Sequence, residues 1–365
     1  MKVVLLAIGY FIRHVYFRDI FFCCSHVSSK SVVTVSKIYR NISSSQFNPA
    51  LDMLGGSSSS PSRIKWTSQS NIQIVKYLDS GRFSNVFEGF VDATPVVLKV
   101  LKPTFMSKVK RELKMLQMVQ GIPGIIKLYG ATKNVDSRTV SLIFEIIGTD
   151  TRWLSHRAVP LTSYEIQRYC FKMLKALDCC HSKGVMHRDI KPRNVLYDRR
   201  SGEVRIIDFG LSDMYTAGKQ YNPSVASRHY KCPELLCEFL YYDYSIDIWS
   251  AGCLLAGLIF DVDPFFNGVD TFDQLHRIAS TLGSSAIYKW VEKFQIQLSA
   301  DMRKAIGSYD VKSFSQFVNK DNCNLCPPDA VDLVQRMLTI DHQERLTAAE
   351  CLLHPYFDNV RQLGI

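Results

Sequence analysis

The chain has 365 residues, of which 47% are hydrophobic, and this length allows one large domain or two with a sizeable core. Its eleven scattered cysteines argue against a disulfide framework and favour a reducing compartment, and the lone Cys323-x-x-Cys326 indicates ordinary thiols rather than a metal site. The formal charge of +10 leaves open nucleic acid, a membrane surface or an acidic protein as partner, while no run of 18 or more apolar residues supports a membrane-spanning helix.

The first 62 residues differ from the rest of the chain. Residues 1–60 carry six Lys or Arg, two Asp, no Glu and twelve serines, and GGSSSSPS closes the stretch. This composition predicts an extension and linker, disordered or used for targeting, whose removal leaves the remainder folded and active. Three interpretations stay open: a secretory signal in MKVVLLAIGYFIRH, an organelle transit peptide, or an unconstrained extension upstream of a true start at Met53.

From Ile72 onward the pattern predicts a small β-rich unit. The runs IQIVKYL, NVFEGF and TPVVLKVL indicate three strands of a meander, followed by a helix from about Ser107 to Gln120 and by two strands in IIKLY and SLIFEII.

Helices dominate from Thr162. Thr162-x-x-Glu165 is a capping box, and a second box, Thr347-x-x-Glu350, is expected to open the last helix. One face of the first helix is apolar, through Ile166, Tyr169, Cys170, Met173, Leu174 and Leu177. The fold class predicted is α+β and bilobal: a β-rich lobe with one main helix over about 72–147, a larger α-helical lobe over about 150–357, and a site between them.

The strongest chemical signal is His187-Arg-Asp-Ile-Lys-Pro-Arg-Asn194, followed by Asp208-Phe-Gly at 208 minus 189, or 19, residues beyond Asp189. Phosphoryl transfer needs a carboxylate at the attacking hydroxyl and oxygen ligands for magnesium. Asp189 suits the first role, and Asn194 and Asp208 suit the second. Lys191 can place its ammonium on the transferring phosphate. A loop whose polar residues only cap and pair would have to produce this whole set by chance.

Two upstream residues fit the same chemistry. Lys99 lies in VVLKV on the third predicted strand, and Glu112 lies in VKRELKML on the following helix. An ion pair between them would orient the lysine toward the α- and β-phosphates. Alone, either residue would more readily be a solvated surface charge.

Downstream, Cys232-Pro-Glu234 closes a segment that begins at Asp208, Arg345 is a partner for Glu234, and Asp247 stands in SIDIWSAG. With these elements the chain resembles a eukaryotic protein kinase over about residues 72–357.

The resemblance narrows in the helical lobe. VASRHYKCPELL, YYDYSIDIWSAGCLLAGLIF, DPFFNGVDTFDQLHRIASTLG and DHQERLTAAECLLHPYF are similar to the casein kinase II catalytic α subunit of the CMGC group. This implies a serine/threonine kinase that phosphorylates acidic protein sites, uses ATP or GTP with Mg²⁺, and joins a regulatory β-subunit dimer. It implies no direct nucleic-acid binding and a location in nucleus and cytoplasm, with an organelle as the alternative.

The stretch LDSGRFSNVF stands in the place of the loop that covers the nucleotide phosphates. Gly81 keeps the central, most demanding glycine and Ser84 matches the family, whereas Asp79 replaces the first glycine and adds a carboxylate near the nucleotide. Apolar members of the predicted set form an adenine pocket or plain core, and Glu145 to Ile147 offer backbone groups. The predicted nucleotide contacts are Leu78, Asp79, Ser80, Gly81, Arg82, Phe83, Ser84, Asn85, Val86, Val97, Lys99, Phe144, Glu145, Ile147, Leu196 and Ile207.

Basic residues are expected around the cleft, where they favour acidic substrates near the acceptor. Each one alone is more often a solvated charge. The predicted substrate contacts are Lys108, Lys110, Arg111, Arg193, Arg228 and Lys231. The family has further cations where Phe105, Met106, Ser107 and Ser224 stand, so selectivity further along the peptide should be shallower. We find no counterpart of the family's aromatic and acidic N-terminal segment, which packs on the activation segment, so constitutive activity is not implied.

Two other function classes compete with an acid-directed kinase. A catalytically weak scaffold or binding module is suggested by Asp79 and by the missing N-terminal segment. A small-molecule phosphotransferase shares the Asp and Asn pattern but does not need the CPE and DIWSAG elements. Because every residue of the catalytic set is in place, an active enzyme is favoured over a pseudokinase.

Overall fold

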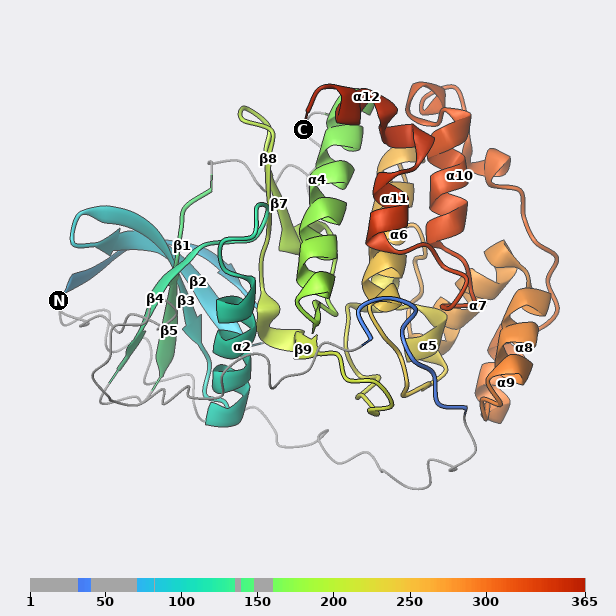
Figure 1. Cartoon of the computed structure of the whole chain (residues 1–365), viewed down its shortest axis with the longest axis horizontal. Helices are drawn as coiled ribbons and strands as arrows, with labels where there is room; N and C mark the ends of the chain where they lie inside the picture. Colours follow the sequence, from blue (N-terminus) through green and yellow to red (C-terminus); the bar gives the residue numbers. More distant parts are fainter. Residues whose placement is uncertain (1–31, 41–70, 82, 135–138, 148–159, 365) are drawn as a thin grey trace.

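The computed structural model describes residues 32–40, 71–81, 83–134, 139–147 and 160–364. A sheet with one helix lies beside a larger body of helices (Figure 1). The predicted bilobal α+β fold is confirmed. The targeting interpretations of residues 1–31 lie outside the described residues, and none of the described helices is long and apolar enough to cross a membrane.

The small lobe is built on one antiparallel sheet with the strand order β1-β2-β3-β5-β4. Asp92 and Ala93 join the second strand to the third and both have positive φ, 50° and 70°, as a tight hairpin turn requires. The strands are β1 (Ile72–Ser80), β2 (Ser84–Val91), β3 (Thr94–Leu101), β4 (Leu128–Lys133) and β5 (Val140–Phe144).

The strand expected in IIKLY starts later than predicted, at Leu128. Ile125 and Ile126 face a different partner: Ile126 N donates to Ile206 O at 3.1 Å, and Ile206 N donates to Gly124 O at 2.7 Å. The sequence predicts Ile125 and Ile126 as part of a strand of the small lobe, but these two residues instead connect the small lobe to the large lobe.

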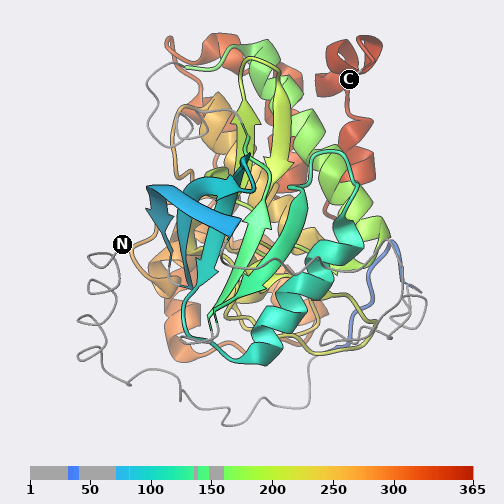
Figure 2. The same ribbon diagram turned by 90° about the vertical axis from the view of Figure 1, so that its left-hand side faces the viewer.

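Helix α2 (Met106–Val119) agrees with the predicted helix and lies alongside the sheet in Figure 2. Its buried apolar residues recur at helical spacing, as Val109, Leu113 and Leu116 illustrate. Glu112 is buried on the same side, so α2 presents one carboxylate from an otherwise apolar face.

The large lobe is helical around α4 and α6. The predicted capping box of α4 forms, because Glu165 N donates to Thr162 Oγ1 at 3.2 Å and Thr162 N donates to Glu165 Oε2 at 2.9 Å. The helices are α4 (Ser163–Ser182), α5 (Pro233–Leu236), α6 (Ser245–Ile259), α7 (Thr271–Leu282), α8 (Ser284–Lys293), α9 (Ala300–Ile306), α10 (Pro328–Met337), α11 (Ala348–Leu352) and α12 (Asp358–Gln362). The second capping box opens α11, which is not the last helix, since α12 follows it.

Short elements connect these helices to the site. Two antiparallel ribbons pair β6 (Val185–Met186) with β9 (Asp213–Met214), and β7 (Val195–Asp198) with β8 (Glu203–Ile206). The 3-10 turns are η3 (Pro192–Asn194), η4 (Phe209–Leu211), η5 (Arg228–Tyr230), η6 (Phe314–Phe317), η7 (Cys323–Leu325) and η8 (Pro355–Phe357).

Residues 32–40 pack against the helical lobe and are drawn in blue in Figure 1. Ser36 N donates to Tyr215 Oη at 2.7 Å, Thr34 Oγ1 donates to Tyr241 O at 2.6 Å, and Tyr39 Oη donates to Asp178 Oδ1 at 3.0 Å. Ser36 is 2% exposed. The composition predicts an extension and linker outside the domain, whereas residues 32–40 contact the helical lobe and, through Tyr215, the segment between Asp208 and Glu234. A pattern of acidic residues does not find them because hydroxyls and backbone amides make the contacts.

Candidate active site

The catalytic loop follows β6 and brings three predicted residues together. Asp189, which is 5% exposed, receives at Oδ2 a bond of 2.7 Å from Lys191 Nζ and one of 2.9 Å from Asn194 Nδ2. Asn194 Nδ2 also donates to Asp189 O at 2.8 Å. The carboxylate of Asp189 is thus held in one orientation at the floor of the site.

Ser227 was not predicted from the sequence, yet it completes this group. Its Oγ donates to Asp189 Oδ1 at 2.9 Å and accepts from Lys191 Nζ at 2.8 Å. It comes directly before η5, and the available signal was a hydroxyl residue shortly before Cys232-Pro-Glu234. With Ser227 in place, both oxygens of Asp189 are oriented by neighbours.

Asp247 on α6 anchors the start of the same loop. Its Oδ1 accepts from Arg188 N at 2.7 Å, and its Oδ2 accepts from His187 N at 2.8 Å. Burial alone raises the pKa of this carboxyl, but the bond of 3.0 Å to His181 and the nearby histidines hold the pKa below its usual value. Arg188 has φ of 67°, a left-handed conformation that costs energy for a non-glycine residue and that these bonds stabilise.

Lys99 on β3 forms the predicted ion pair with Glu112. Lys99 Nζ lies 2.7 Å from Glu112 Oε1 and 2.6 Å from Asp208 Oδ1. Burial by itself lowers the pKa of Lys99, but the two carboxylates outweigh it and raise the pKa above its usual value. Burial likewise raises the pKa of Asp208, and Lys99 more than reverses that effect. Helix α2 is therefore docked in the position that orients Lys99 into the cleft.

The residues predicted as magnesium ligands have oxygens to offer. Asn194 uses its amide hydrogens on Asp189, which leaves Oδ1 for a cation. Asp208 uses Oδ1 for Lys99, and its side chain is 42% exposed. In the described part of the chain no group of three or more His, Cys, Asp or Glu is arranged to hold a metal. The oxygens of Asn194 and Asp208 therefore suit a hard cation such as Mg²⁺ that is also coordinated by oxygens of a nucleotide.

The turn between β1 and β2 is tied together by its own polar groups. Gly81 N donates to Ser84 O at 2.8 Å, Ser80 Oγ donates to Asn85 Oδ1 at 2.8 Å, and Lys102 Nζ donates to Gly81 O at 2.7 Å. A Cβ added at Gly81 would meet only Ser84 O, at 3.8 Å. The protein itself leaves room for a Cβ here, and the prediction that Gly81 is the most demanding position stays a prediction, because it concerns the approach of the backbone to phosphate oxygens.

Two further residues of this turn complete the predicted set. Asp79 Oδ1 accepts from Ser80 N at 2.8 Å, next to a register shift in the pairing of β1 with β2. Arg82 lies outside the described residues.

Apolar residues of the predicted adenine pocket lie on facing elements. Val97 on β3 pairs with Phe144 on β5, and Ile207 N donates to Asn194 O at 2.9 Å, which aligns the floor with the catalytic loop. All are half-buried apart from the buried Phe144, as expected for side chains that line a cleft. The half-buried members are Leu78, Val86, Val97, Ile147, Leu196 and Ile207.

Glu145 contributes less to the hinge than predicted. Its N–H donates to Lys127 O at 3.0 Å, and its carboxylate accepts from Lys127 N and Arg205 Nε, both at 3.0 Å. The carbonyl of Glu145 is the backbone group left for a nucleotide.

The predicted substrate cations occupy different environments. Lys110 and Arg193 are exposed, and Lys108 Nζ lies 5.8 Å from the centre of the Phe83 ring. Arg111 donates to Gly210 O at 3.3 Å, so it supports the turn after Asp208. Burial lowers the pKa of Lys231, whose Nζ donates to Pro223 O at 3.3 Å.

Beyond the cleft, the predicted pair of Arg345 with Glu234 is fully buried, with N–O distances of 2.7 and 3.0 Å. Arg188 Nη1 also donates to Tyr242 Oη at 3.1 Å, and Tyr242 Oη donates to Asn222 O at 2.7 Å. These bonds hold the middle of the segment between Asp208 and Glu234, at Asn222, and its end, at Glu234, against the helical lobe.

Residues 72–357, most of the chain, match the family model described as protein kinase domain. The match contains every element of the site described above. It supports a phosphotransferase that uses ATP, typically with Mg²⁺, and acts on protein substrates. The chain belongs to the protein kinase family.

Proposed function

We propose that this kinase is of the casein kinase II type and transfers the γ-phosphate of ATP to serine or threonine in acidic sequence contexts. The serine/threonine preference and the subfamily rest on the resemblance of the helical-lobe segments. Acid selectivity has its own support in the position of Lys231.

The chain's own residues account for the transfer step. Asp189, oriented by Asn194 and Ser227, accepts the proton of the acceptor hydroxyl as that oxygen bonds to the γ-phosphorus, while the bond from the γ-phosphorus to the bridging oxygen of the β-phosphate breaks and ADP leaves. Lys191 stabilises the negative charge on the transferring group, and Lys99 holds the α- and β-phosphates. Bound magnesium would neutralise charge between the β- and γ-phosphates, with Asn194 and Asp208 as its protein ligands.

The position and environment of Lys231 are the observation that best supports a preference for acidic substrates. It follows η5, four residues after Ser227, and so stands beside the group that receives the acceptor hydroxyl. In the described part of the chain its ammonium makes one hydrogen bond, to a carbonyl, so it has donors left for a carboxylate. A half-buried ammonium binds a carboxylate more strongly than a solvated one does, because less water competes for it.

An intact catalytic set argues against a scaffold. A pseudokinase needs no Lys99–Glu112 pair, whereas here the pair forms at 2.7 Å and Asp208 joins it.

A regulatory β dimer is the partner that the resemblance implies, and exposed apolar side chains on the edge strand β1 support it. Ile74, Val75 and Tyr77 are 58%, 62% and 55% exposed. Apolar groups gathered on one strand favour a protein contact. Val75→Glu should abolish co-elution with a purified β dimer in size-exclusion chromatography while leaving peptide turnover by the isolated chain unchanged. Retention of the complex by this variant would contradict the proposed surface.

The main test compares peptides with Ser, Thr or Tyr acceptors followed by three Asp or by three Ala. Lys231→Glu should raise KM for the acidic Ser peptide by about 10-fold or more and change KM for the neutral one less than about 2-fold, because a cation–carboxylate contact becomes a repulsion. The difference should shrink in high salt.

Two controls accompany this test. Lys231→Arg should keep the acidic preference, and Lys320→Glu applies the same charge reversal to an exposed lysine of a distant loop. A parent protein that prefers basic peptides, or that phosphorylates only tyrosine, would overturn the proposal; a parent with no turnover on any peptide would favour the scaffold.

A further inference from the structure

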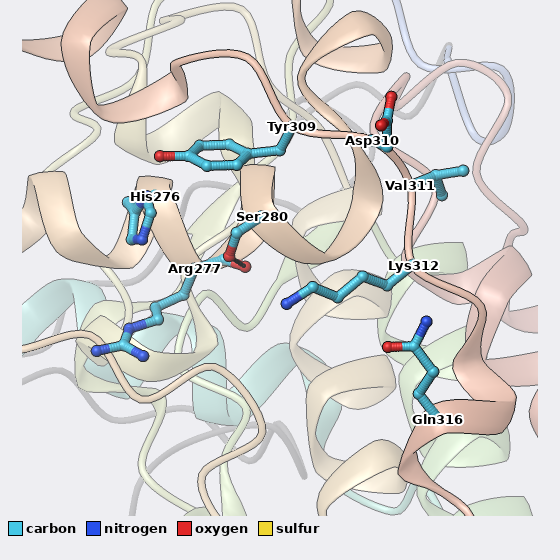
Figure 3. Close-up of a pocket in the computed structure, with 8 residues that line it drawn as sticks. All are labelled: His276, Arg277, Ser280, Tyr309, Asp310, Val311, Lys312 and Gln316. Atoms are coloured by element: carbon cyan, nitrogen blue, oxygen red, sulfur yellow. Dashed lines mark hydrogen bonds between the residues drawn. The ribbon is translucent and has the colours of Figure 1, made fainter.

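A cavity lies on the helical lobe away from the catalytic residues. Helix α7 and the segment that follows α9 line this cavity, which is open to solvent and has a volume of about 650 Å³ (Figure 3). Helix α7 supplies His276, Arg277 and Ser280, and the later segment supplies Tyr309 and Lys312. Tyr309 and Lys312 are exposed, so the cavity opens to solvent.

The walls of this cavity are held in place by hydrogen bonds. Lys312 N donates to Thr281 O at 2.9 Å, and Tyr309 N donates to Ser284 Oγ at 2.9 Å. The rings of His276 and Tyr309 meet edge to face, with centres 5.2 Å apart. Because this wall is already ordered, the protein loses less conformational entropy when a segment binds to it.

Lys312 supplies the positive charge that faces the middle of the cavity, and Arg277 adds a second cation at its edge. Figure 3 draws the ammonium of Lys312 pointing toward the middle of the lining residues, and the carboxylate of Asp310 pointing away. Arg277 Nε lies 3.4 Å from Asp273 Oδ1, and Lys312 has no side-chain partner among the residues that the structure describes. These donors suit carboxylates or phosphoserine.

The start of helix α7 is bonded to η5, which directly follows Ser227 of the catalytic site. Arg228 donates to Val269 O, the His229 ring donates from Nε2 to Gly268 O at 3.2 Å, and Gln274 Nε2 donates to His229 O at 3.2 Å. Helix α7 is thereby joined to η5. At 1.5 Å per residue, Arg277 and Ser280 lie about 9 to 14 Å along α7 from its first residue, Thr271, and with the residues before the helix roughly five extended residues cover the span from Val269.

We propose that this cavity docks an acidic stretch of the protein substrate about five or more residues away from the acceptor. The inference rests on the proposed acid-directed function and extends it to a second point of contact. The lining cations are spread across an open surface, and this arrangement fits several carboxylates along a peptide better than one small anion. The exposed Val311, at 70%, adds an apolar contact beside them.

The test uses the full chain and two fluorescent peptides. The short peptide carries Ser followed by three Asp, and the long one adds six Asp or Glu separated from the acceptor by a five-residue neutral spacer, with the extension placed on either side in separate versions. In the parent, one long version should have a KM at least about 5-fold lower than the short peptide, because linking two weak contacts raises the effective concentration of the second.

The double variant Arg277→Gln/Lys312→Gln should raise KM for that long peptide to the value of the short one and leave kcat and the short-peptide KM unchanged. The matched double variant Lys175→Gln/Lys289→Gln removes the same charge from exposed lysines that do not line the cavity, and it should retain the long-peptide advantage. Equal unfolding midpoints of all three proteins would exclude damage to the fold.

Binding of the acidic extension alone, with no acceptor, separates this proposal from the proposed function. Fluorescence anisotropy should detect binding to the parent and several-fold weaker binding to the Arg277/Lys312 variant, whether or not the short peptide is phosphorylated. Equal binding to both proteins, equal KM of short and long peptides in the parent, or full competition by equimolar inorganic phosphate would each overturn the docking site.

Discussion

The catalytic loop and the β1–β2 turn are both predicted to act on the nucleotide phosphates, yet they are held in different ways. Asp189 and Asp247 are 5% and 0% exposed, and Asp247 binds backbone amides some 60 residues away in the chain. The β1–β2 turn is exposed, and its bonds join Ser80, Gly81, Asn85 and Lys102 to one another. A group that transfers a proton must be fixed by the fold, whereas a turn that covers phosphates needs only backbone amides within reach. The turn can therefore carry Asp79, its one departure from the family pattern, without disturbing the buried bonds of the catalytic loop.

The largest effect should come from the buried side of this comparison. Asp189→Asn should lower kcat by roughly 10³-fold, within the range that a general base contributes. It should leave the dissociation constant for ATP nearly unchanged, because Asp189 acts on the acceptor hydroxyl. Steady-state kinetics and calorimetric nucleotide titration check the two parts separately. Unchanged kcat would remove Asp189 from the mechanism, and lost nucleotide binding would indicate that the substitution disturbed the loop.

Breaking the fully buried ion pair of Arg345 and Glu234 should lower the stability of the fold rather than the catalytic rate. Arg345→Met leaves the buried carboxylate of Glu234 without its partner, and this should lower the free energy of unfolding by about 3–5 kcal/mol. The exposed pair of Arg336 with Asp332 offers a matched control, since Arg336→Met should cost less than about 1 kcal/mol. Denaturant unfolding measures both.

The pH dependence sharpens this second test. Burial raises the pKa of Glu234, but Arg345 outweighs it and holds the pKa below its usual value, so in the parent the stabilisation is present at neutral pH and lost as pH falls through the folded pKa. Without Arg345, burial should raise the pKa of Glu234. The free energy of unfolding of the variant should therefore be lowered most at neutral pH, where Glu234 is charged, and less as Glu234 becomes protonated. The gap in stability should therefore narrow toward about pH 4, near the unfolded pKa of Glu. A gap that does not change with pH would contradict this account.

Sequence reasoning succeeded where a residue type and a spacing carry the function. The two capping boxes, helix α2 and the pairs Lys99–Glu112 and Arg345–Glu234 were all predicted and are present. Prediction from the sequence failed where a contact joins residues that only the tertiary fold brings together. The bond from Ser227 to Asp189 spans 38 residues, and the bond from Ser36 to Tyr215 spans 179. The sequence does not indicate which distant residue a hydroxyl or a backbone amide will contact. Ile125 was predicted to lie in a strand of the small lobe because its bridge to Ile206 is visible only in the fold.

Residues 32–40 are an intermediate case, because Thr34 and Ser36 are buried while Val33 remains exposed. Deleting residues 1–40 removes the hydrogen bonds of Thr34, Ser36 and Tyr39 and should lower stability by about 2–3 kcal/mol, at roughly 1 kcal/mol for each bond. Deleting residues 1–31 keeps every one of these contacts and is the control. Chemical denaturation of the two truncated chains checks the difference. If both unfold at the same denaturant concentration, residues 32–40 contribute no stability.

The smallest effect should come from the exposed turn. Asp79→Gly removes a carboxylate near the expected phosphates and should tighten ATP binding by about 3-fold, a modest gain because solvent and salt screen an exposed charge. It also removes the bond from Ser80 N to Asp79 Oδ1, which lies beside the register shift between Tyr77 and Asp79.

Asp79→Asn separates the two consequences, since it removes the charge but keeps an acceptor for Ser80 N. If repulsion dominates, both variants should bind ATP more tightly than the parent and the gain should fade in high salt. If only the glycine variant gains, backbone freedom is the cause. Weaker binding by both variants would mean that the carboxylate stabilises the turn in the form that accepts the nucleotide, and the exposed region would then depend on specific side chains as the buried one does.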